Sequence, residues 1–206
     1  MKSVSEKYEI KKEQILEAAS ELLAYYGYEK TTLDDIANKV GVKKNSIYYY
    51  FDSKEELINE IITRIFESKV KLFEEKSAAA KNSLEKLKIF ISVFVSHKYS
   101  EEKTYNITPS AYLEISKVVE KSFEQYVVEA ENLIREVLNE GKRKGELRNH
   151  NAKEVARIIL EFTKALELMT YSNSETKFID SNLQSELEGK VLQFIELIYH
   201  GIKKSN

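Results

Sequence analysis

Apolar residues recur every three to four positions along most of this chain, the spacing that places them on one face of an α-helix. The first such stripe runs from Ile15 to Tyr26 and stops at Gly27. A single proline and six glycines among 206 residues leave few points at which a helix must break. The pattern therefore predicts an all-α protein.

Between residues 31 and 57 the pattern predicts two short helices joined by a tight turn, with a third helix directly after them. Thr32 and Ser53 stand at the N-cap positions of the first and third helices, each with an acidic residue three positions later. Gly41 falls where the first helix ends, since a left-handed backbone is favourable for glycine. This arrangement predicts a helix-turn-helix unit.

The second helix of this unit is expected from about Lys43 to Tyr50, with Ile47 and Phe51 turned inward. Its outward face then carries lysine, asparagine, serine and tyrosine, which suit the phosphates and base edges of a DNA major groove. From Lys39 to Lys54 there are four lysines and one aspartate, a local net charge of +3. The charge alone is a weak indication, because such a stretch is more often a solvated helix face.

The rest of the chain predicts a larger helical unit. A connecting helix starts at Ser53, and the pair Thr108-Pro109 marks another helix start, since proline is favoured at the first helical position. From there to Lys144 the helical pattern continues, with room for a kink, and two further helices follow. We place the domain boundary after residue 53, which gives domains at 1–53 and 54–206.

Composition excludes several classes of protein. No apolar run approaches the ~18 residues of a membrane span, and the N-terminus lacks a hydrophobic signal core, so we expect a cytoplasmic protein without membrane contact. The chain has no cysteine and three scattered histidines, so we expect no disulfide and no metal site. It also lacks a phosphate loop, a nucleophile elbow and the zinc-protease or di-iron motifs. We expect neither an enzyme nor a cofactor.

Three segments together resemble the TetR-type (TetR/AcrR) family of helix-turn-helix transcriptional regulators: ILEAASELLAYYGYEKTT, LDDIANKVGVKKNSIYYYF and DSKEEL. The resemblance covers the first quarter to third of the chain, and the remainder matches in length and helical character. It implies a DNA-binding domain at 1–53 and a helical-bundle ligand-binding and dimerisation domain at 54–206. It also implies a homodimeric regulator that binds a palindromic double-stranded DNA operator and is released from it by a small molecule. We expect this regulator to be a repressor.

The resemblance assigns roles within the helix-turn-helix unit. Phosphate contacts position such a protein on DNA, whereas contacts to base edges specify the sequence. The expected phosphate contacts are Thr32, Tyr48, Tyr49 and Lys54, the expected base-reading residues are Lys44, Asn45 and Ser46, and Lys43 is assigned to either group.

In the family the C-terminal domain holds the effector pocket, and here the candidate lining is aromatic and mildly polar. Aromatic residues at helical spacing form ordinary core more often than a pocket, and a histidine near a helix end is more often a surface or capping residue. The pattern offers little buried charge, so we expect a mostly apolar effector of unknown identity. The candidates are Phe90, Phe94, His97, Tyr105, Tyr112, Tyr126, Phe162, Leu166 and Met169.

The last two helices are the expected dimer interface. Family members dimerise through these helices into a four-helix bundle, and a helix-turn-helix that reads a two-fold operator needs two copies. From patterning alone, ordinary core packing explains the same apolar residues at least as well. The expected interface residues are Val155, Ile159, Leu187, Val191, Phe194, Ile195 and Ile198.

A second hypothesis is a helical adaptor that binds protein and has no small-molecule effector. A DNA-binding protein loses affinity steeply as salt rises, because binding releases counterions from the DNA. An adaptor would show little such dependence, so a salt titration with DNA distinguishes the two hypotheses.

Overall fold

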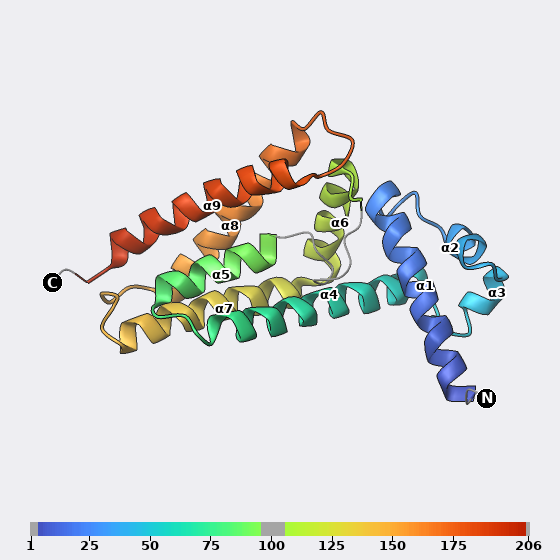
Figure 1. The fold of residues 1–206 in the computed structure, drawn as a ribbon, viewed down its shortest axis with the longest axis horizontal. Coiled ribbons are helices and arrows are strands. Elements are labelled where there is room, and N and C mark those ends of the chain that lie inside the picture. Colours follow the sequence, from blue (N-terminus) through green and yellow to red (C-terminus); the bar gives the residue numbers. More distant parts are fainter. Residues whose placement is uncertain (1–3, 96–105, 205–206) are drawn as a thin grey trace.

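The computed structural model describes residues 4–95 and 106–204, and the candidates His97 and Tyr105 lie outside these residues. The described part is built of α-helices (Figure 1). Their bounds are α1 (Val4–Tyr26), α2 (Leu33–Val40), α3 (Lys44–Ile47), α4 (Lys54–Ser77), α5 (Ser83–Val95), α6 (Pro109–Ser122), α7 (Glu124–Arg143), α8 (Ala152–Ser172) and α9 (Ser181–Ile202).

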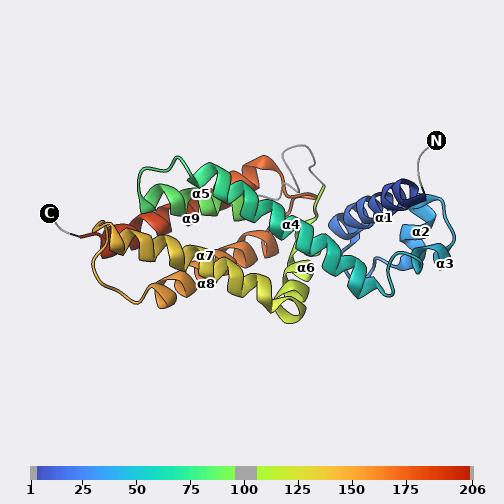
Figure 2. The same cartoon turned by 90° about the horizontal axis from the view of Figure 1, so that it is seen from below.

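The molecule is elongated, with α1, α2 and α3 at one end and α5, α7, α8 and α9 at the other (Figures 1 and 2). The long helix α4 runs from the first group into the second, and α6 lies between them. The predicted fold class is confirmed: an all-α chain with an N-terminal helix-turn-helix domain and a C-terminal helical domain. Within the described ranges, no helix is both long and apolar enough to cross a membrane.

Local capping fixes both ends of α2 as the sequence predicts. The backbone N–H of Asp35 donates to the Thr32 hydroxyl at 3.2 Å, and the backbone N–H of Thr32 donates to the Asp35 carboxylate at 3.0 Å. At the other end Gly41 has φ +74°, a left-handed conformation that glycine adopts without a steric penalty. The turn into α3 is therefore determined by residues next to it in the sequence.

Two helix boundaries differ from the prediction. The helix α3 covers only Lys44–Ile47, because the Ile47 carbonyl accepts from both the Tyr50 and the Phe51 N–H and the chain turns there to bury Phe51. The helical pattern after Pro109 divides into α6 and α7 at Phe123, whose φ of −134° is not helical. Phe123 is 8% exposed and packs with the N-terminal core, which accounts for the break.

Two apolar cores hold the fold together. The N-terminal core joins α1, α2 and α3 to the first half of α4, and it includes Phe123 from the α6–α7 junction. The C-terminal core is formed mainly by α5, α7, α8 and α9, with Phe73 from the second half of α4. Each large aliphatic side chain buried in this way contributes roughly 1.5–3 kcal/mol. Since α4 contributes to both cores, the boundary after residue 53 stays a prediction.

The start of α6 is docked on the end of α1. The Thr108 N–H donates to the Ala24 carbonyl at 3.0 Å, and the Thr108 hydroxyl donates to the Tyr25 carbonyl at 3.2 Å. One turn further along α6, the Glu114 carboxylate accepts from the backbone N–H of Glu29. A side-chain carbon at Gly27 would lie 2.1 Å from that carboxylate, so this contact requires glycine. The C-terminal domain thus touches the helix that braces the helix-turn-helix.

Candidate DNA interface and effector pocket

The predicted DNA contacts lie on α3 and on the segments that flank it. Ile47 and Phe51 are buried beneath this surface, as the sequence predicts, and they orient its polar side chains outward. Tyr49 is 74% exposed, more than any other large hydrophobic or aromatic side chain of the unit. Of the eight predicted contacts, Ser46 and Lys54 are half-buried, and the others are exposed: Thr32, Lys43, Lys44, Asn45, Tyr48 and Tyr49.

Lys44, a predicted base-reading residue, is paired within the protomer. Its ammonium lies 2.6 Å from a carboxylate oxygen of Asp34 on α2. The hydrogen bond to Asp34 and the charge of that carboxylate raise the pKa of Lys44. Both side chains are exposed, so the pair contributes little to stability. The Lys44 ammonium can therefore leave Asp34 for another acceptor at small cost.

Lys54, a predicted phosphate contact, points toward the α1–α2 loop. Its ammonium donates to the Tyr28 carbonyl and lies 4.1 Å from the centre of the Tyr28 ring. Burial lowers the pKa of Lys54, against the charges of Glu55 and Glu114. This lysine holds the loop in the structure, and its contact with DNA stays a prediction.

An aromatic cluster supports the predicted phosphate contacts from α1. The Tyr8 ring stacks on Tyr50 with ring centres 4.7 Å apart, and it meets the Tyr49 ring edge-on at 5.8 Å. The start of α1 therefore braces the turn after α3. The sequence pattern did not single out Tyr8, because the contact joins residues more than forty positions apart.

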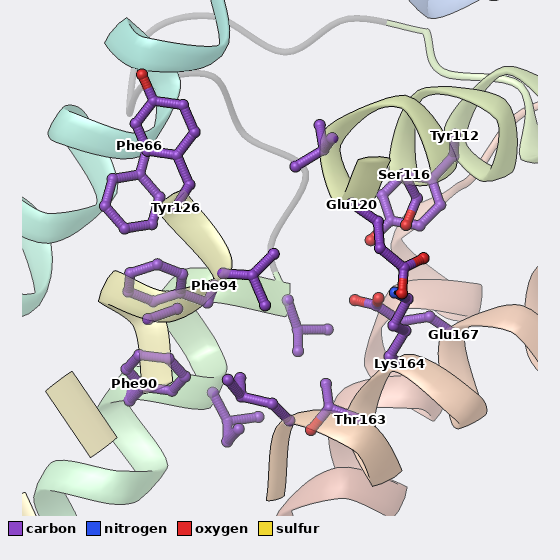
Figure 3. A pocket seen from close by; sticks show the side chains of 16 residues that line it. Phe66, Phe90, Phe94, Tyr112, Ser116, Glu120, Tyr126, Thr163, Lys164 and Glu167 are labelled. Carbon is purple, nitrogen blue, oxygen red and sulfur yellow. The ribbon is translucent and has the colours of Figure 1, made fainter. Parts of the chain in front are cut away.

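A cavity of about 240 Å³ lies in the C-terminal domain among α4, α5, α6, α7 and α8 (Figure 3). Four predicted pocket residues line it: Phe90, Phe94, Tyr112 and Tyr126. Further residues that the sequence reasoning missed also line it, among them Phe66, Ser116, Glu120, Thr163, Lys164 and Glu167. Within the described ranges, no group of His, Asp and Glu could hold a metal ion.

Glu167 is a carboxylate inside the bundle. It accepts a hydrogen bond from the Tyr112 hydroxyl. Burial raises the pKa of Glu167, although this hydrogen bond and the charges of Lys69 and Lys164 act in the opposite direction. The helical pattern gave no signal for this group, because a glutamate on a long helix is read as solvent-exposed.

Lys69 lies close to this part of the cavity. Its ammonium donates to the Phe94 carbonyl at 2.8 Å. The ammonium nitrogen also lies 5.9 Å from the centre of the Phe94 ring. Burial lowers the pKa of Lys69 to about 8, while the charge of Glu167 acts to raise it. The C-terminal domain therefore contains an acid and a base whose ordinary pKa values are both shifted by burial.

The comparisons with known proteins agree with this geometry. Residues 15–61 match the family model described as bacterial regulatory proteins, tetR family. The helix-turn-helix segment of this chain is therefore similar to that of the tetR family.

Curated relatives match about a quarter of the chain. The biofilm operon icaADBC HTH-type negative transcriptional regulator IcaR of Staphylococcus epidermidis is 42% identical over 55 residues, which is 27% of this chain and 30% of the relative. IcaR of Staphylococcus aureus strain Newman is 43% identical over 56 residues, again 27% and 30% of the two chains. The chain thus aligns with less than a third of the length of these relatives.

Solved TetR-type structures match nearly the whole chain. A transcriptional regulator (TerR/AcrR family) from Aquifex aeolicus VF5 superposes with a TM-score of 0.64 at 27% identity, covering 91% of this chain and 99% of that one. A putative transcriptional regulator from Saccharomonospora viridis in complex with choline gives a TM-score of 0.75 at 18% identity, covering 96% and 100%. The second likeness shows the shared fold alone.

Three predicted pocket residues do not line the cavity. The Phe162 ring stacks on Phe194 of α9 with ring centres 3.6 Å apart. Met169 is 60% exposed, and Leu166 packs against the C-terminal core. They lie on other faces of α8 from the lining residues Thr163 and Glu167, so the structure does not bring them to the cavity.

The residues of the predicted dimer interface fall into a buried group and a half-buried group. Ile159, Leu187, Val191 and Ile195 are each at most 1% exposed within the protomer, because α9 packs on α5 and α8 through this stripe. These four side chains leave almost no surface for a partner, and their place in a dimer seam stays a prediction that this packing does not favour. Val155, Phe194 and Ile198 are half-buried and remain candidates. Large apolar side chains that the protomer leaves exposed on α8 and α9 are Ile158, Leu168, Met169 and Leu197.

Proposed function

We propose that this TetR-family protein is a homodimeric transcriptional regulator that represses its genes by binding a palindromic DNA operator and is released by a small molecule. The recognition surface is α3 with the residues that flank it. The effector occupies the cavity among α4 to α8. The IcaR relatives are described as negative transcriptional regulators, which supports repression rather than activation.

The observation that carries the proposal is the position of α6. One face of this helix lines the cavity through Tyr112, Ser116 and Glu120. Its first turns contact the end of α1 through Thr108 and Glu114. A ligand that shifts α6 therefore also moves α1, the helix that braces the helix-turn-helix, because α6 contacts α1 directly.

The second connection is α4. Phe66 lines the cavity, while Ile61 of the same helix belongs to the N-terminal core. Tilting α4 would change the separation of the two recognition helices in a dimer. Half-sites on DNA lie about one helical turn apart, ~34–36 Å, and tolerate little change in that separation. Coupling between the two sites is typically ~1–3 kcal/mol and is reciprocal, so operator DNA weakens effector binding by the same factor.

The exposed apolar strip on α8 and α9 supports a dimer. Ile158, Phe162 and Met169 follow helical spacing along α8, and Phe194, Leu197 and Ile198 do so on α9. The stack of Phe162 on Phe194 joins the two stripes into one surface. The surface of α9 at Gly189 is also uncovered in the protomer, since a side-chain carbon there would meet no atom within 4 Å. Burying such a strip against a second copy is the most direct way to remove it from water.

A small-molecule effector is supported by the cavity and by one fold neighbour. The Saccharomonospora viridis regulator was solved in complex with choline, so a protein of this fold binds a small organic molecule. The alternative adaptor would use the same exposed α3 surface for a protein partner and would leave the cavity without a role.

Selection of bound fragments from a random DNA pool tests the proposal. We expect enrichment of a palindrome whose half-sites lie about one turn apart, with affinity that falls steeply as salt rises. Tyr49→Ala should weaken binding, whereas Tyr26→Ala, on an exposed residue of α1 outside the predicted contacts, should not. No enrichment, together with salt-independent capture of a protein, would favour the adaptor.

A further inference from the structure

The cavity has two chemically different walls (Figure 3). Aromatic rings from α4, α5 and α7 form one of them: Phe90 stacks on Phe94 at 4.2 Å, and Phe66 lies 5.0 Å from Tyr126 and 5.8 Å from Phe94. The rings are therefore one continuous aromatic surface. Polar side chains from α6 and α8 form the facing wall: Tyr112, Ser116, Glu120, Thr163, Lys164 and Glu167.

The charges on the polar wall do not cancel. Its ionisable lining residues are Glu120, Lys164 and Glu167, two acids and one base. Lys164 forms an ion pair with Glu120, which neutralises both. Glu167 is left with a hydrogen bond from the Tyr112 hydroxyl. Lys69 attracts it from nearby, but the Lys69 ammonium bonds to the Phe94 carbonyl and is not part of the lining.

We propose that the cavity takes an organic cation, with its positive centre beside Glu167 and its apolar part against the aromatic wall. The inference rests on the proposed function, because it names the chemical class of the effector for the same cavity. It differs from the expectation of a mostly apolar effector, which stays a prediction.

Two physical effects favour a cation here. The face of an aromatic ring carries negative potential, so a cation held among several rings is attracted by each of them, by ~0.5–2 kcal/mol per contact. A carboxylate removed from water is stabilised by a positive partner, and it retains acceptor positions beyond the one that Tyr112 uses. A neutral apolar ligand would add no positive partner to the charges of Lys69 and Lys164, and an anion would be repelled by Glu167.

The protonation of Glu167 agrees with this reasoning. Burial raises the pKa of the Glu167 carboxyl, against the opposing effects of Tyr112, Lys69 and Lys164. Glu120 faces the same region through its pair with Lys164. A bound cation would favour the ionised carboxylate, so part of the binding would be coupled to release of a proton.

The test compares three probes that share one apolar group: benzyltrimethylammonium, its uncharged carbon isostere neopentylbenzene, and the anion phenylmethanesulfonate. Affinities for the full chain are measured from protein NMR shifts on titration. We expect the cation to bind at least tenfold more tightly than the isostere, and the anion to bind least. Equal or tighter binding of the isostere or the anion would overturn the proposal, as would a cation that does not bind.

Glu167→Gln removes the charge and keeps the shape and an acceptor for Tyr112. It should weaken the cation at least tenfold and leave the isostere unchanged. Glu161→Gln is the matched control, on an exposed α8 residue paired with Arg157 at the helix surface, and should change neither affinity. Unchanged cation affinity in Glu167→Gln would contradict the assignment. If this variant does not fold, the wild-type comparison of cation and isostere still decides.

Operator binding separates this inference from the proposed function. A cation that binds the cavity but leaves operator affinity unchanged would overturn induction and keep the ligand class. Release of the operator by the isostere and not by the cation would keep induction and overturn the ligand class.

Discussion

Lys44 on α3 and Lys69 on α4 are both bonded within the protomer, but in opposite surroundings. Lys44 is exposed, and its pair with Asp34 raises its pKa. Lys69 lies in the bundle, where burial lowers its pKa to about 8. An exposed pair can exchange Asp34 for a nucleic-acid acceptor at little cost, whereas a buried ammonium depends on the bonds around it. The Lys44 ammonium is thus free to exchange its partner for another acceptor. The Lys69 ammonium stays protonated only as far as its surroundings stabilise the positive charge.

The two ends of the molecule also differ in how closely they resemble known proteins. The family model matches residues 15–61, and relatives at 42–43% identity align with about a quarter of the chain. Fold neighbours that cover more than nine-tenths of the chain have identities of 18% and 27%. Every DNA duplex presents a similar phosphate backbone, so one set of side chains serves many regulators.

The largest expected effect separates buried from exposed apolar positions on α9. Val191→Asp places a charge in the protomer core and should cost roughly 4 kcal/mol or more, which leaves unfolded protein. Leu197→Asp, on a residue that is 72% exposed, should fold normally and give a monomer. Circular dichroism and sedimentation measure the two outcomes. A folded Val191→Asp monomer would contradict the placement of this side chain in the core.

Apolar patterning alone could not make that distinction. On α9 two stripes are apolar, and only packing decides that Leu187, Val191 and Ile195 turn inward while Leu197 stays exposed. Glu167 escaped prediction for a related reason, because helical spacing does not tell which partners enclose a charged residue. By contrast, Thr32 and Gly41 form local caps whose partners are within five residues, so the sequence predicted the boundaries of α2. 

The next effect concerns DNA. Lys44→Ala should change which operator is preferred, by roughly 1–3 kcal/mol per lost bidentate base contact. Tyr48→Ala should weaken binding to all sequences alike, since a phosphate contact carries no base information. Binding to a panel of operator variants measures both. Unchanged preference and affinity in Lys44→Ala would mean that the base-reading surface is placed wrongly.

Alkaline stability contrasts the two lysines directly. The pKa of Lys69 is depressed, so the folded protein releases its proton from about pH 8 while the unfolded chain keeps it up to its ordinary value of 10.5. The contribution of Lys69 to stability therefore rises with pH across this window and is lost as pH falls through 8, by roughly 1–3 kcal/mol. The free energies of unfolding of the wild type and of Lys69→Met are measured by chemical denaturation across this pH range. Their difference at each pH gives the contribution of Lys69.

Lys44 should show the opposite sign. Its folded pKa is raised, so its stabilising contribution is present below 10.5 and declines as pH rises beyond that value. The effect should be much smaller because Lys44 is exposed. A contribution of Lys69 that falls between pH 8 and 10.5 would show that its ammonium is not destabilised by burial.

The smallest effect concerns Asp34. Asp34→Asn removes the charge that holds Lys44 and lies beside the DNA surface, so affinity for all DNA sequences should rise by roughly 0.5–1 kcal/mol. The matched control is Asp180→Asn, at the N-cap of α9 and remote from α3. Fluorescence anisotropy with random-sequence DNA measures the difference. Weaker binding by Asp34→Asn would mean that the pair positions Lys44 for contact rather than competing with DNA.

Phe123 has a consequence for how such regulators can be recombined. It stands seventy residues beyond Ser53, yet it packs in the N-terminal core beside Leu57 and Ile61. The DNA-reading module is thus discontinuous along the gene. A chimera that grafts the first third of this chain onto another regulator would have to supply an aromatic side chain at the α6–α7 junction of the recipient, or a gap would open beneath α4. Shuffling of operator and effector specificities is therefore constrained by one residue outside the helix-turn-helix segment.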